Sequence, residues 1–323
     1  MTNRLLGRTG LSVHPIGFGG WAIGGNRFGN SYGSTDDGES QRAVRRAHEL
    51  GCNFFDTADV YGHGHSEELL GAALAGIRQS VIVATKLGGN FYNRGVNPLL
   101  LGRIAEALGH PLDQEPPDVP LPVTHDADFS PSYVRFAVER SLRRLRTDYI
   151  DLLQLHNPAL SLIADPETYQ VLEDVKREGK IRFYGVSVHP PEEGVAAVDV
   201  ARPDTVQLVY NIVRREAEQT FLPAARVANV GVIAREPLAN GLLAARYRPD
   251  SLWEQGDIRA RMPRPYVTQL VALSERVREL AVAEGLTAAQ LALKFVLDND
   301  AVSVVIVGMK TVAQVEENLS VET

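Results

Sequence analysis

Residues 80–86 read SVIVATK and residues 149–156 read YIDLLQLH, two apolar runs that each end on a polar side chain. Short continuous apolar runs of this kind are typical of strands that are buried on both faces. Similar runs occur at six further places, namely residues 15–19, 53–56, 182–187, 205–209, 230–234 and 303–307. The sequence therefore predicts eight buried strands.

Helical patterns separate these runs, most clearly at residues 37–50, 66–75, 131–146 and 166–178. Ser130 is the predicted N-cap of the third pattern, with Pro131 in its first turn, and Gly179 ends the fourth. Strands that alternate with helices form a parallel sheet whose faces are all covered. Eight such units predict an α/β fold, a (β/α)8 TIM barrel, with residues 1–323 as one domain.

An open, doubly wound sheet fits the same alternation. That fold binds dinucleotides through a glycine signature at which a helix begins directly. Gly17, Gly19 and Gly20 are present, but the residues that follow, 21–35, are a glycine-rich loop. The closed barrel is therefore the preferred prediction.

Two segments lie outside the repeating units. Residues 4–6 and 12–14 flank a turn and predict an N-terminal β-hairpin that plugs the bottom of the barrel. Residues 88–130 form a long loop after strand 3 that contains six prolines, and a short helix is expected at 100–108. This loop leaves the carboxyl end of a strand, so it is expected on the active-site side.

The composition is that of an ordinary globular protein, with 44% apolar and 23% charged residues. A single cysteine, Cys52, excludes an intrachain disulfide and suits the reducing cytoplasm, the expected location. We find no secretory pattern and no apolar run near the ~18 residues of a membrane span. The net charge of -7 argues against a nucleic-acid partner. Arg140, Arg143, Arg144 and Arg146 are interpreted as the polar face and cationic end of a helix.

Polar residues follow three consecutive strands. Asp56 ends the second strand and Tyr61 lies in the loop after it, while Lys86 ends the third strand and His156 the fourth. Each of them alone has an ordinary structural explanation. Because the carboxyl ends of barrel strands meet at one mouth, however, we expect the four side chains to lie close together.

These residue types suit hydride transfer between a nicotinamide cofactor and a carbonyl group. The oxygen that receives negative charge must be protonated, and Tyr61 is the candidate donor. A lysine ammonium nearby favours the phenolate and so lowers the phenol pKa, while Asp56 would keep Lys86 charged and oriented. His156 can hydrogen-bond the carbonyl oxygen.

Several motifs resemble the aldo-keto reductases over nearly the whole chain. They are FFDTADVYG (54–62), ATKLGG (84–89), LLQLHNP (152–158), the opening RLLGRTGLSVHPIGFGGWAIGG (4–25) and the closing GMKTVAQVEENL (308–319). The resemblance implies that Asp56, Tyr61, Lys86 and His156 form the catalytic tetrad of that family. It also implies NADPH, less often NADH, bound in an extended pose across the barrel mouth.

The resemblance extends to cofactor contacts. Ser187 and Gln207 match positions at the nicotinamide carboxamide, and loop 236–242 matches the pyrophosphate segment. Residues 308–311, together with two side chains of the last helix, match the adenosine end, where the helix N-terminus is an anion site. The full implied set is Gly20, Trp21, Asp56, Asn157, Ser187, Gln207, Arg235, Pro237, Leu238, Gly241, Leu242, Gly308, Lys310, Thr311, Gln314 and Asn318.

Some positions depart from the family. Val188 replaces a common asparagine, and Arg235 stands where many members stack an aromatic ring on the nicotinamide, a role that a guanidinium plane can also fill. Lys310 is the cation placed near a 2′-phosphate, so NADPH is preferred over NADH. The loop at 247–265, with Asp257, Arg259 and Arg261, is expected to fold over the cofactor.

The substrate side is predicted from the loops of the mouth. Trp21, Tyr61, His63 and His156 are the expected substrate contacts, and loop 88–130 should contribute. His63 and His65 have no carboxylate or cysteine arranged around them in the sequence, so no metal site is predicted.

Three functions follow from this pattern. The leading one is NADPH-dependent reduction of small aldehydes or ketones. The first alternative is an NAD(P)-dependent sugar or polyol dehydrogenase working in the oxidative direction, because the same groups serve both directions. The second is a cofactor-binding regulatory protein similar to potassium-channel β subunits, with weak turnover.

Overall fold

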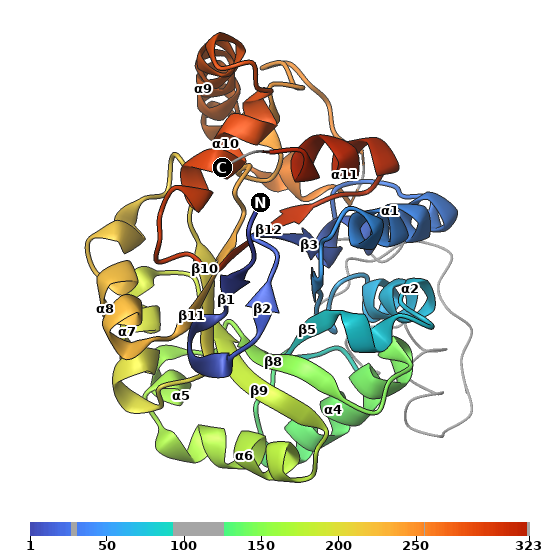
Figure 1. Ribbon diagram of the computed structural model, residues 1–323, viewed down its shortest axis with the longest axis vertical. Coiled ribbons are helices and arrows are strands. Elements are labelled where there is room, and N and C mark those ends of the chain that lie inside the picture. Colours follow the sequence, from blue (N-terminus) through green and yellow to red (C-terminus); the bar gives the residue numbers. More distant parts are fainter. Residues whose placement is uncertain (27–30, 93–125, 255, 322–323) are drawn as a thin grey trace.

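A computed structural model describes residues 1–26, 31–92, 126–254 and 256–321. Eight parallel strands close into a barrel, and their order around it follows the chain (Figure 1). The predicted barrel is confirmed, and each strand bound agrees with its prediction within two residues. The strands are β3 (Ile16–Gly19), β4 (Phe54–Asp56), β5 (Ile82–Leu87), β8 (Ile150–His156), β9 (Ile181–Ser187), β10 (Thr205–Val209), β11 (Gly231–Arg235) and β12 (Val304–Gly308).

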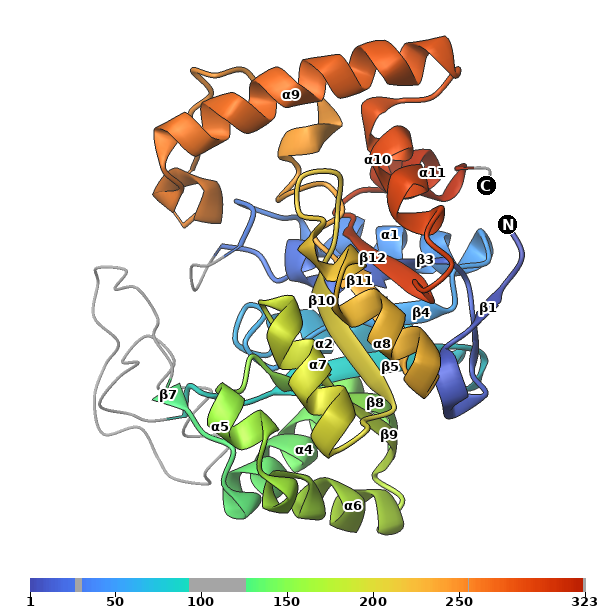
Figure 2. The same ribbon diagram turned by 90° about the vertical axis from the view of Figure 1, so that its left-hand side faces the viewer.

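Helices surround the barrel, and one of them lies beyond it. Figure 2 shows α9 crossing the top of the molecule, where it packs on α10 and on the 3-10 turn η7 (Leu242–Ala244). The predicted helix at 166–178 begins as the 3-10 turn η5 (Pro166–Tyr169) before it continues as α6. The helices are α1 (Asp37–Glu49), α2 (His65–Ala73), α4 (Pro131–Leu145), α5 (Leu160–Ile163), α6 (Gln170–Arg177), α7 (Pro191–Val200), α8 (Phe221–Ala228), α9 (Arg264–Ala283), α10 (Ala288–Leu297) and α11 (Val312–Leu319).

The N-terminal hairpin closes one end of the barrel, as predicted. Strands β1 (Arg4–Leu5) and β2 (Ser12–Val13) pair antiparallel, and Leu6 and Val13 are fully buried with the residues that fill the barrel interior. The turn between them begins at Gly7, which has φ +51°. A Cβ at this position would lie 2.2 Å from the backbone nitrogen of Gly231, so only glycine allows this approach.

The segment after the third strand starts and ends with a small ladder that the sequence did not predict. Strand β6 (Gly89–Asn90) pairs antiparallel with β7 (Asp126–Ala127), and the Tyr133 hydroxyl donates to the Gly89 carbonyl at 2.9 Å. The predicted helix at 100–108 lies outside the described residues. Ser130 caps α4 as predicted, because its Oγ accepts from the backbone nitrogen of Tyr133.

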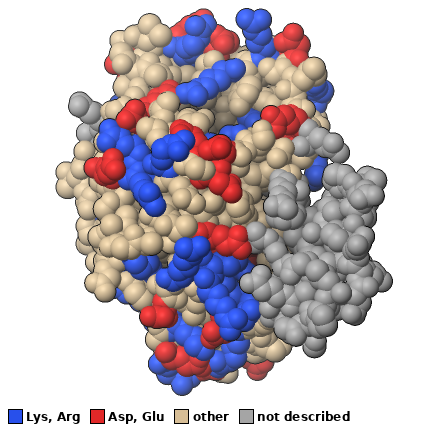
Figure 3. Space-filling view, turned by 90° about the vertical axis from the view of Figure 1, so that its right-hand side faces the viewer, with Lys and Arg blue, Asp and Glu red and all other residues tan. Residues whose placement is uncertain are grey.

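The arginine cluster of α4 agrees in part with its interpretation as the polar face and cationic end of a helix, because Arg143 and Arg144 lie in the last turn. Figure 3 shows Lys and Arg gathered toward the lower end of one face, with further Lys and Arg higher on the same face. Arg144, however, is 13% exposed and turned inward, where its Nε donates to Glu67 Oε2 at 2.6 Å. Its guanidinium also donates to the Tyr92 hydroxyl at 2.6 Å. Glu67 on α2 is fully buried, so its charge requires a cation from the neighbouring helix.

Among the described helices, none is by itself long and apolar enough to cross a membrane. Helices α9 and α10 reach that length and composition only together, and they are bent by 84° where they meet.

Candidate active site

Asp56 and Lys86 form a buried ion pair at the carboxyl ends of β4 and β5. Both side chains are at most 1% exposed. Lys86 Nζ donates to Asp56 Oδ1 at 2.5 Å, to the Thr57 carbonyl at 2.9 Å and to Tyr61 Oη at 3.2 Å. The parallel register that pairs Asp56 with Ala84 brings these groups to one level of the barrel. The lysine is therefore held between a carboxylate and a phenol.

Tyr61 joins this pair from the loop after β4. Its ring stacks on Trp21, with centroids 5.8 Å apart, and meets His156 edge-on at the same distance. His156 is the last residue of β8, as predicted. The structure thus brings together the four residues that the sequence placed at one mouth.

Burial and charge set the protonation of Lys86 and Tyr61. Burial lowers the pKa of Lys86, but the Asp56 carboxylate and the Tyr61 hydroxyl outweigh it, so the net pKa is raised and the ammonium stays charged. Burial raises the pKa of Tyr61, and the Lys86 ammonium lowers it. The lysine therefore acts in the expected direction, but burial prevails and the net pKa of Tyr61 is raised above its ordinary value.

Two glutamines hold the second oxygen of Asp56. Gln207 Nε2 donates to Asp56 Oδ2 at 2.9 Å and Gln154 Nε2 donates to the same oxygen at 3.2 Å. Ser187 Oγ lies 3.5 Å from Gln207 Oε1. The sequence analysis did not find Gln154, although it interrupts an apolar strand two residues before His156. Strand residues two apart share a face, and that spacing was the available signal.

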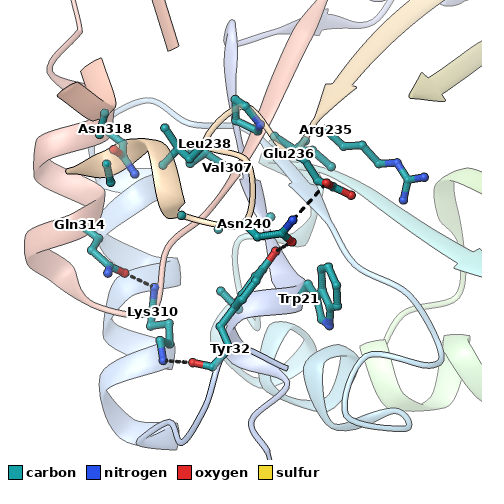
Figure 4. A pocket seen from close by; sticks show the side chains of 18 of the residues that line it. Trp21, Tyr32, Arg235, Glu236, Leu238, Asn240, Val307, Lys310, Gln314 and Asn318 are labelled. Atoms are coloured by element: carbon teal, nitrogen blue, oxygen red, sulfur yellow. Dashed lines mark hydrogen bonds between the residues drawn. The ribbon is translucent and has the colours of Figure 1, made fainter. Parts of the chain in front are cut away.

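A large cleft runs from Tyr61 to α11, with about 1070 Å³ of empty space, part of it open to solvent. Figure 4 shows its wall, where Trp21 and Arg235 lie toward one end and Gln314 and Lys310 toward the other. Most of the implied cofactor residues line it, namely Trp21, Asp56, Gln207, Arg235, Pro237, Leu238, Gly241, Gly308, Lys310, Gln314 and Asn318.

Five implied cofactor residues lie behind the wall of the cleft or beside it. Ser187 contacts Gln207, and Asn157 accepts from Arg235 at 3.3 Å. A Cβ at Gly20 would lie 2.8 Å from the Asp56 carbonyl, so this glycine allows close packing behind the ion pair. Leu242 is fully buried in the cluster under α9. Thr311 caps α11 by accepting from the backbone nitrogen of Gln314.

Two backbone nitrogens at the start of α11, the anion site expected from the sequence, have acceptors within the protein. The backbone nitrogen of Val312 donates to Glu39 Oε1 at 2.9 Å, and that of Gln314 donates to Thr311 Oγ1 at 3.3 Å. A carboxylate of α1 therefore already interacts with the positive end of this helix.

The sequence analysis missed three polar residues on the wall. Tyr32 donates its hydroxyl hydrogen to Asn240 Oδ1 at 2.9 Å. Arg246 pairs with Glu317 at the α11 end of the cleft. Tyr247 contacts the guanidinium of Arg259, and both residues were expected only as part of the covering loop at 247–265. These side chains come from loops, whose conformations have no periodic signal in the sequence.

Two loops from opposite sides of the cleft are joined into what we call the clasp, formed by residues 31–34, Glu254 and residues 256–259. Ser31 and Asp257 form a β-bridge, and the Ile258 nitrogen donates to the Ser31 carbonyl at 2.9 Å. Glu254 Oε2 accepts from the Ser34 nitrogen at 2.8 Å, and Lys310 Nζ donates to the Tyr32 carbonyl at 2.8 Å. The loop predicted to fold over the cofactor thus crosses the edge of the cleft.

The two histidines after Tyr61 have separate environments. His63 is buried, with its ring edge-on to Phe91, and it does not line the cleft. His65 contradicts the expectation that no carboxylate lies near it. Its Nε2 lies 2.9 Å from Asp37 and its Nδ1 3.5 Å from Glu68, because α1 and α2 begin side by side. Within the described residues, no group of His, Cys, Asp or Glu could hold a metal ion.

Comparison with known proteins identifies the family. The sequence model of the Aldo/keto reductase family matches residues 15–323. The chain belongs to the aldo-keto reductase family. It is therefore an NAD(P)H-dependent oxidoreductase, and the family uses nicotinamide cofactors.

Relatives with defined names include both dehydrogenases and reductases. The L-galactose dehydrogenase of Arabidopsis thaliana is 31% identical over 99% of this chain and 88% of its own length. The structure of a glycerol dehydrogenase from Gluconobacter oxydans matches with a TM-score of 0.77 and 31% identity, over 100% of this chain and 90% of that one. The structure of an aldo-keto reductase of Klebsiella pneumoniae in complex with NADPH matches with a TM-score of 0.68 and 25% identity. The match covers 99% of this chain and 89% of that one.

Proposed function

We propose that this aldo-keto reductase uses NADPH to reduce the carbonyl group of small aldehydes or ketones, with Tyr61 as the general acid. The observation that carries the proposal is the position of Lys86 at one end of the cleft. Its buried ammonium donates to Asp56 Oδ1 and to Tyr61 Oη. This arrangement holds a phenol next to a fixed cation, which is what a tyrosine needs to give up its proton.

The side chains divide the work as follows. The cofactor, when bound, supplies the hydride. Tyr61 Oη holds the proton for the substrate oxygen, and Lys86 stabilises the phenolate that remains after the proton leaves. Asp56 keeps the ammonium charged and oriented, because burial alone would favour neutral lysine. His156 is beside the Tyr61 ring and would donate a hydrogen bond to the carbonyl oxygen.

The wall of the cleft fits a phosphorylated dinucleotide. Arg246, Arg259 and Lys310 place three cations on it, and cations bind phosphate through charged hydrogen bonds. Lys310 Nζ donates to the Tyr32 and Ser34 carbonyls. In the described part of the chain it has no carboxylate within 4.0 Å. A cation without a carboxylate partner favours the extra phosphate of NADPH over NADH. The NADPH bound to the Klebsiella relative supports the same choice.

Two of the relatives support a second candidate, a sugar or polyol dehydrogenase that works in the oxidative direction. They are the L-galactose dehydrogenase and the glycerol dehydrogenase. In that direction the Tyr61 phenolate accepts the proton of the alcohol, and the same Lys86 contact stabilises it. The observed geometry serves both directions, by microscopic reversibility.

The test follows NADPH and NADH absorbance with a panel of aldehydes, α-dicarbonyls and aldoses, and the oxidised cofactors with sugars and polyols. Tyr61→Phe removes the acidic hydrogen and should lower kcat by about 10²–10⁴-fold while cofactor binding persists. Tyr266→Phe is the matched control, because Tyr266 is 39% exposed on α9 and should change nothing. Tight cofactor binding without turnover in either direction would contradict the proposal and favour a regulatory protein.

A further inference from the structure

Arg235, the last residue of β11, is held firmly at the Tyr61 end of the cleft. Its guanidinium donates through one nitrogen to the Val188 carbonyl at 3.0 Å, to His189 Nδ1 at 3.2 Å and to Asn157 Oδ1 at 3.3 Å. These acceptors follow the ends of β8 and β9. In Figure 4 the guanidinium points away from the Lys310 and Gln314 end of the cleft. Its position is therefore fixed by neutral groups of the mouth.

No acidic side chain compensates the charge of Arg235 within the described residues. It forms no ion pair there, whereas the fully buried Lys86 is neutralised by Asp56 at 2.5 Å. Glu236 also lines the cleft, but its carboxylate accepts from the Asn240 amide at 3.4 Å. Arg235 Nε is buried without a hydrogen-bond partner. The mouth thus holds a positioned cation that no carboxylate neutralises within the described residues.

An uncompensated cation that is partly removed from water is costly unless a ligand supplies the opposite charge. Arg235 is close enough to Tyr61 for its charge to lower the pKa of that hydroxyl, against the opposing effect of burial. Arg235 and Tyr61 line the same cleft, so a ligand anion at Arg235 would share that cleft with Tyr61 Oη.

We propose that Arg235 forms an anion subsite for the substrate, so that the preferred carbonyl compounds carry a carboxylate a few bonds from the reacting carbon. This inference rests on the proposed function, in which Tyr61 marks the reacting end. A guanidinium binds carboxylate through two parallel hydrogen bonds, and the contacts to Val188, His189 and Asn157 hold it in place for that pairing. A phosphate of the cofactor has the same chemistry, and the test separates the two sources.

The first experiment compares matched substrates that differ in charge, succinic semialdehyde against butanal and 4-carboxybenzaldehyde against 4-methylbenzaldehyde. In the wild type we expect kcat/KM to be about tenfold or more higher for the carboxylate member of each pair, mainly through KM. Arg235→Gln should abolish the preference and Arg235→Lys should keep part of it. Added salt should weaken it.

Arg214→Gln is the matched control. Arg214 is a nearby cation that pairs with Glu216 and does not line the cleft. If the preference reflected only the general charge of this face, both substitutions would reduce it equally, and the subsite would be refuted. Equal kcat/KM for the two members of each pair in the wild type would refute it as well.

A second measurement separates substrate from cofactor and does not depend on turnover. Fluorescence titration gives the Kd of NADPH for wild type and Arg235→Gln, and calorimetry gives the binding of unreactive benzoate and benzamide to the cofactor-loaded protein. Weaker benzoate binding in the variant with unchanged NADPH affinity supports the subsite. Weaker NADPH binding with equal losses for all substrates assigns Arg235 to the cofactor and overturns it. If no carbonyl compound is turned over, the proposed function fails, and the benzoate result still decides the subsite.

Discussion

The floor of the cleft and its rim are built in different ways. The floor is a buried network of hydrogen-bonded side chains, each at most 1% exposed and each from a barrel strand. They are Asp56, Lys86, Gln154 and Gln207. The rim consists of the clasp and of the loops after β8, β9 and β11. There, non-glycine residues take positive φ, as at Asn157, Glu236 and Asn240, and the side chains of these three are half-buried or exposed.

The difference shows where chemistry and binding are separable. Strand register sets the floor: Lys86 lies opposite Gln154, and His156 lies opposite Ser187. A substitution there acts on the reaction and on the stability of the barrel together. Rim residues hold their positions through loop contacts, so substitutions there should change affinity, selectivity or exchange rates with little effect on folding.

The largest effect is expected for Lys86→Met. Asp56 then remains buried without its cation, which should lower the free energy of unfolding by roughly 3–5 kcal/mol. Tyr61 also loses the group that stabilises its phenolate, so kcat should fall by about 10²–10⁴-fold. Thermal and denaturant unfolding, with steady-state kinetics, measure both losses.

The exposed lysine on α10 is the matched control. Lys294 pairs with Asp298 at 3.4 Å near the surface, and Lys294→Met should cost only about 0–1 kcal/mol with no change in kcat. The proposed role of the floor would be wrong if the two variants lost similar stability and activity.

A smaller effect is expected for Gln154→Leu, which keeps the volume and removes one donor to Asp56 Oδ2. The Asp56 carboxylate, with one hydrogen bond fewer, should attract the Lys86 ammonium more strongly. The ammonium should then stabilise the Tyr61 phenolate less. The pKa of Tyr61, already raised by burial, should rise further, and the pH at which alcohol oxidation becomes fast should shift upward. We expect a roughly tenfold loss of kcat at neutral pH.

Leu152→Val tests whether such a shift is specific. Leu152 lies on the same strand and fills the barrel interior one layer below. This variant should lose about 1 kcal/mol of stability through its cavity and keep the wild-type pH profile. An unshifted profile in Gln154→Leu would remove the glutamine from the account of Tyr61 acidity.

The contrast also explains what the sequence could predict. Asp56, Lys86 and His156 end apolar runs, so knowledge of the strands alone brought them to one mouth. Gln154 was within reach of the same reasoning. The clasp could not be predicted in this way, because Ser31 and Ile258 are joined by a backbone hydrogen bond between loops that are distant in the chain. The contact of Glu39 with the start of α11 could not be predicted either, because it depends on how α1 and α11 lie beside each other.

The smallest effect is expected for Glu254→Gln in the clasp. The exposed Glu254 carboxylate accepts from the Ser34 nitrogen and hydroxyl, and these hydrogen bonds hold its pKa below the ordinary 4.5. A depressed pKa means that the carboxylate supports the clasp at neutral pH and that this support is lost as the pH falls through the lowered value.

If the clasp opens for cofactor release, NADPH should dissociate about two- to fivefold faster from the variant in stopped-flow fluorescence. The wild type should approach the variant's rate only in acid, whereas Glu275→Gln, which breaks a pair with Arg278 on α9, should behave as wild type throughout. Identical dissociation rates in all three proteins at neutral pH would mean that the cofactor leaves without the clasp opening, and the rim would then serve selectivity alone.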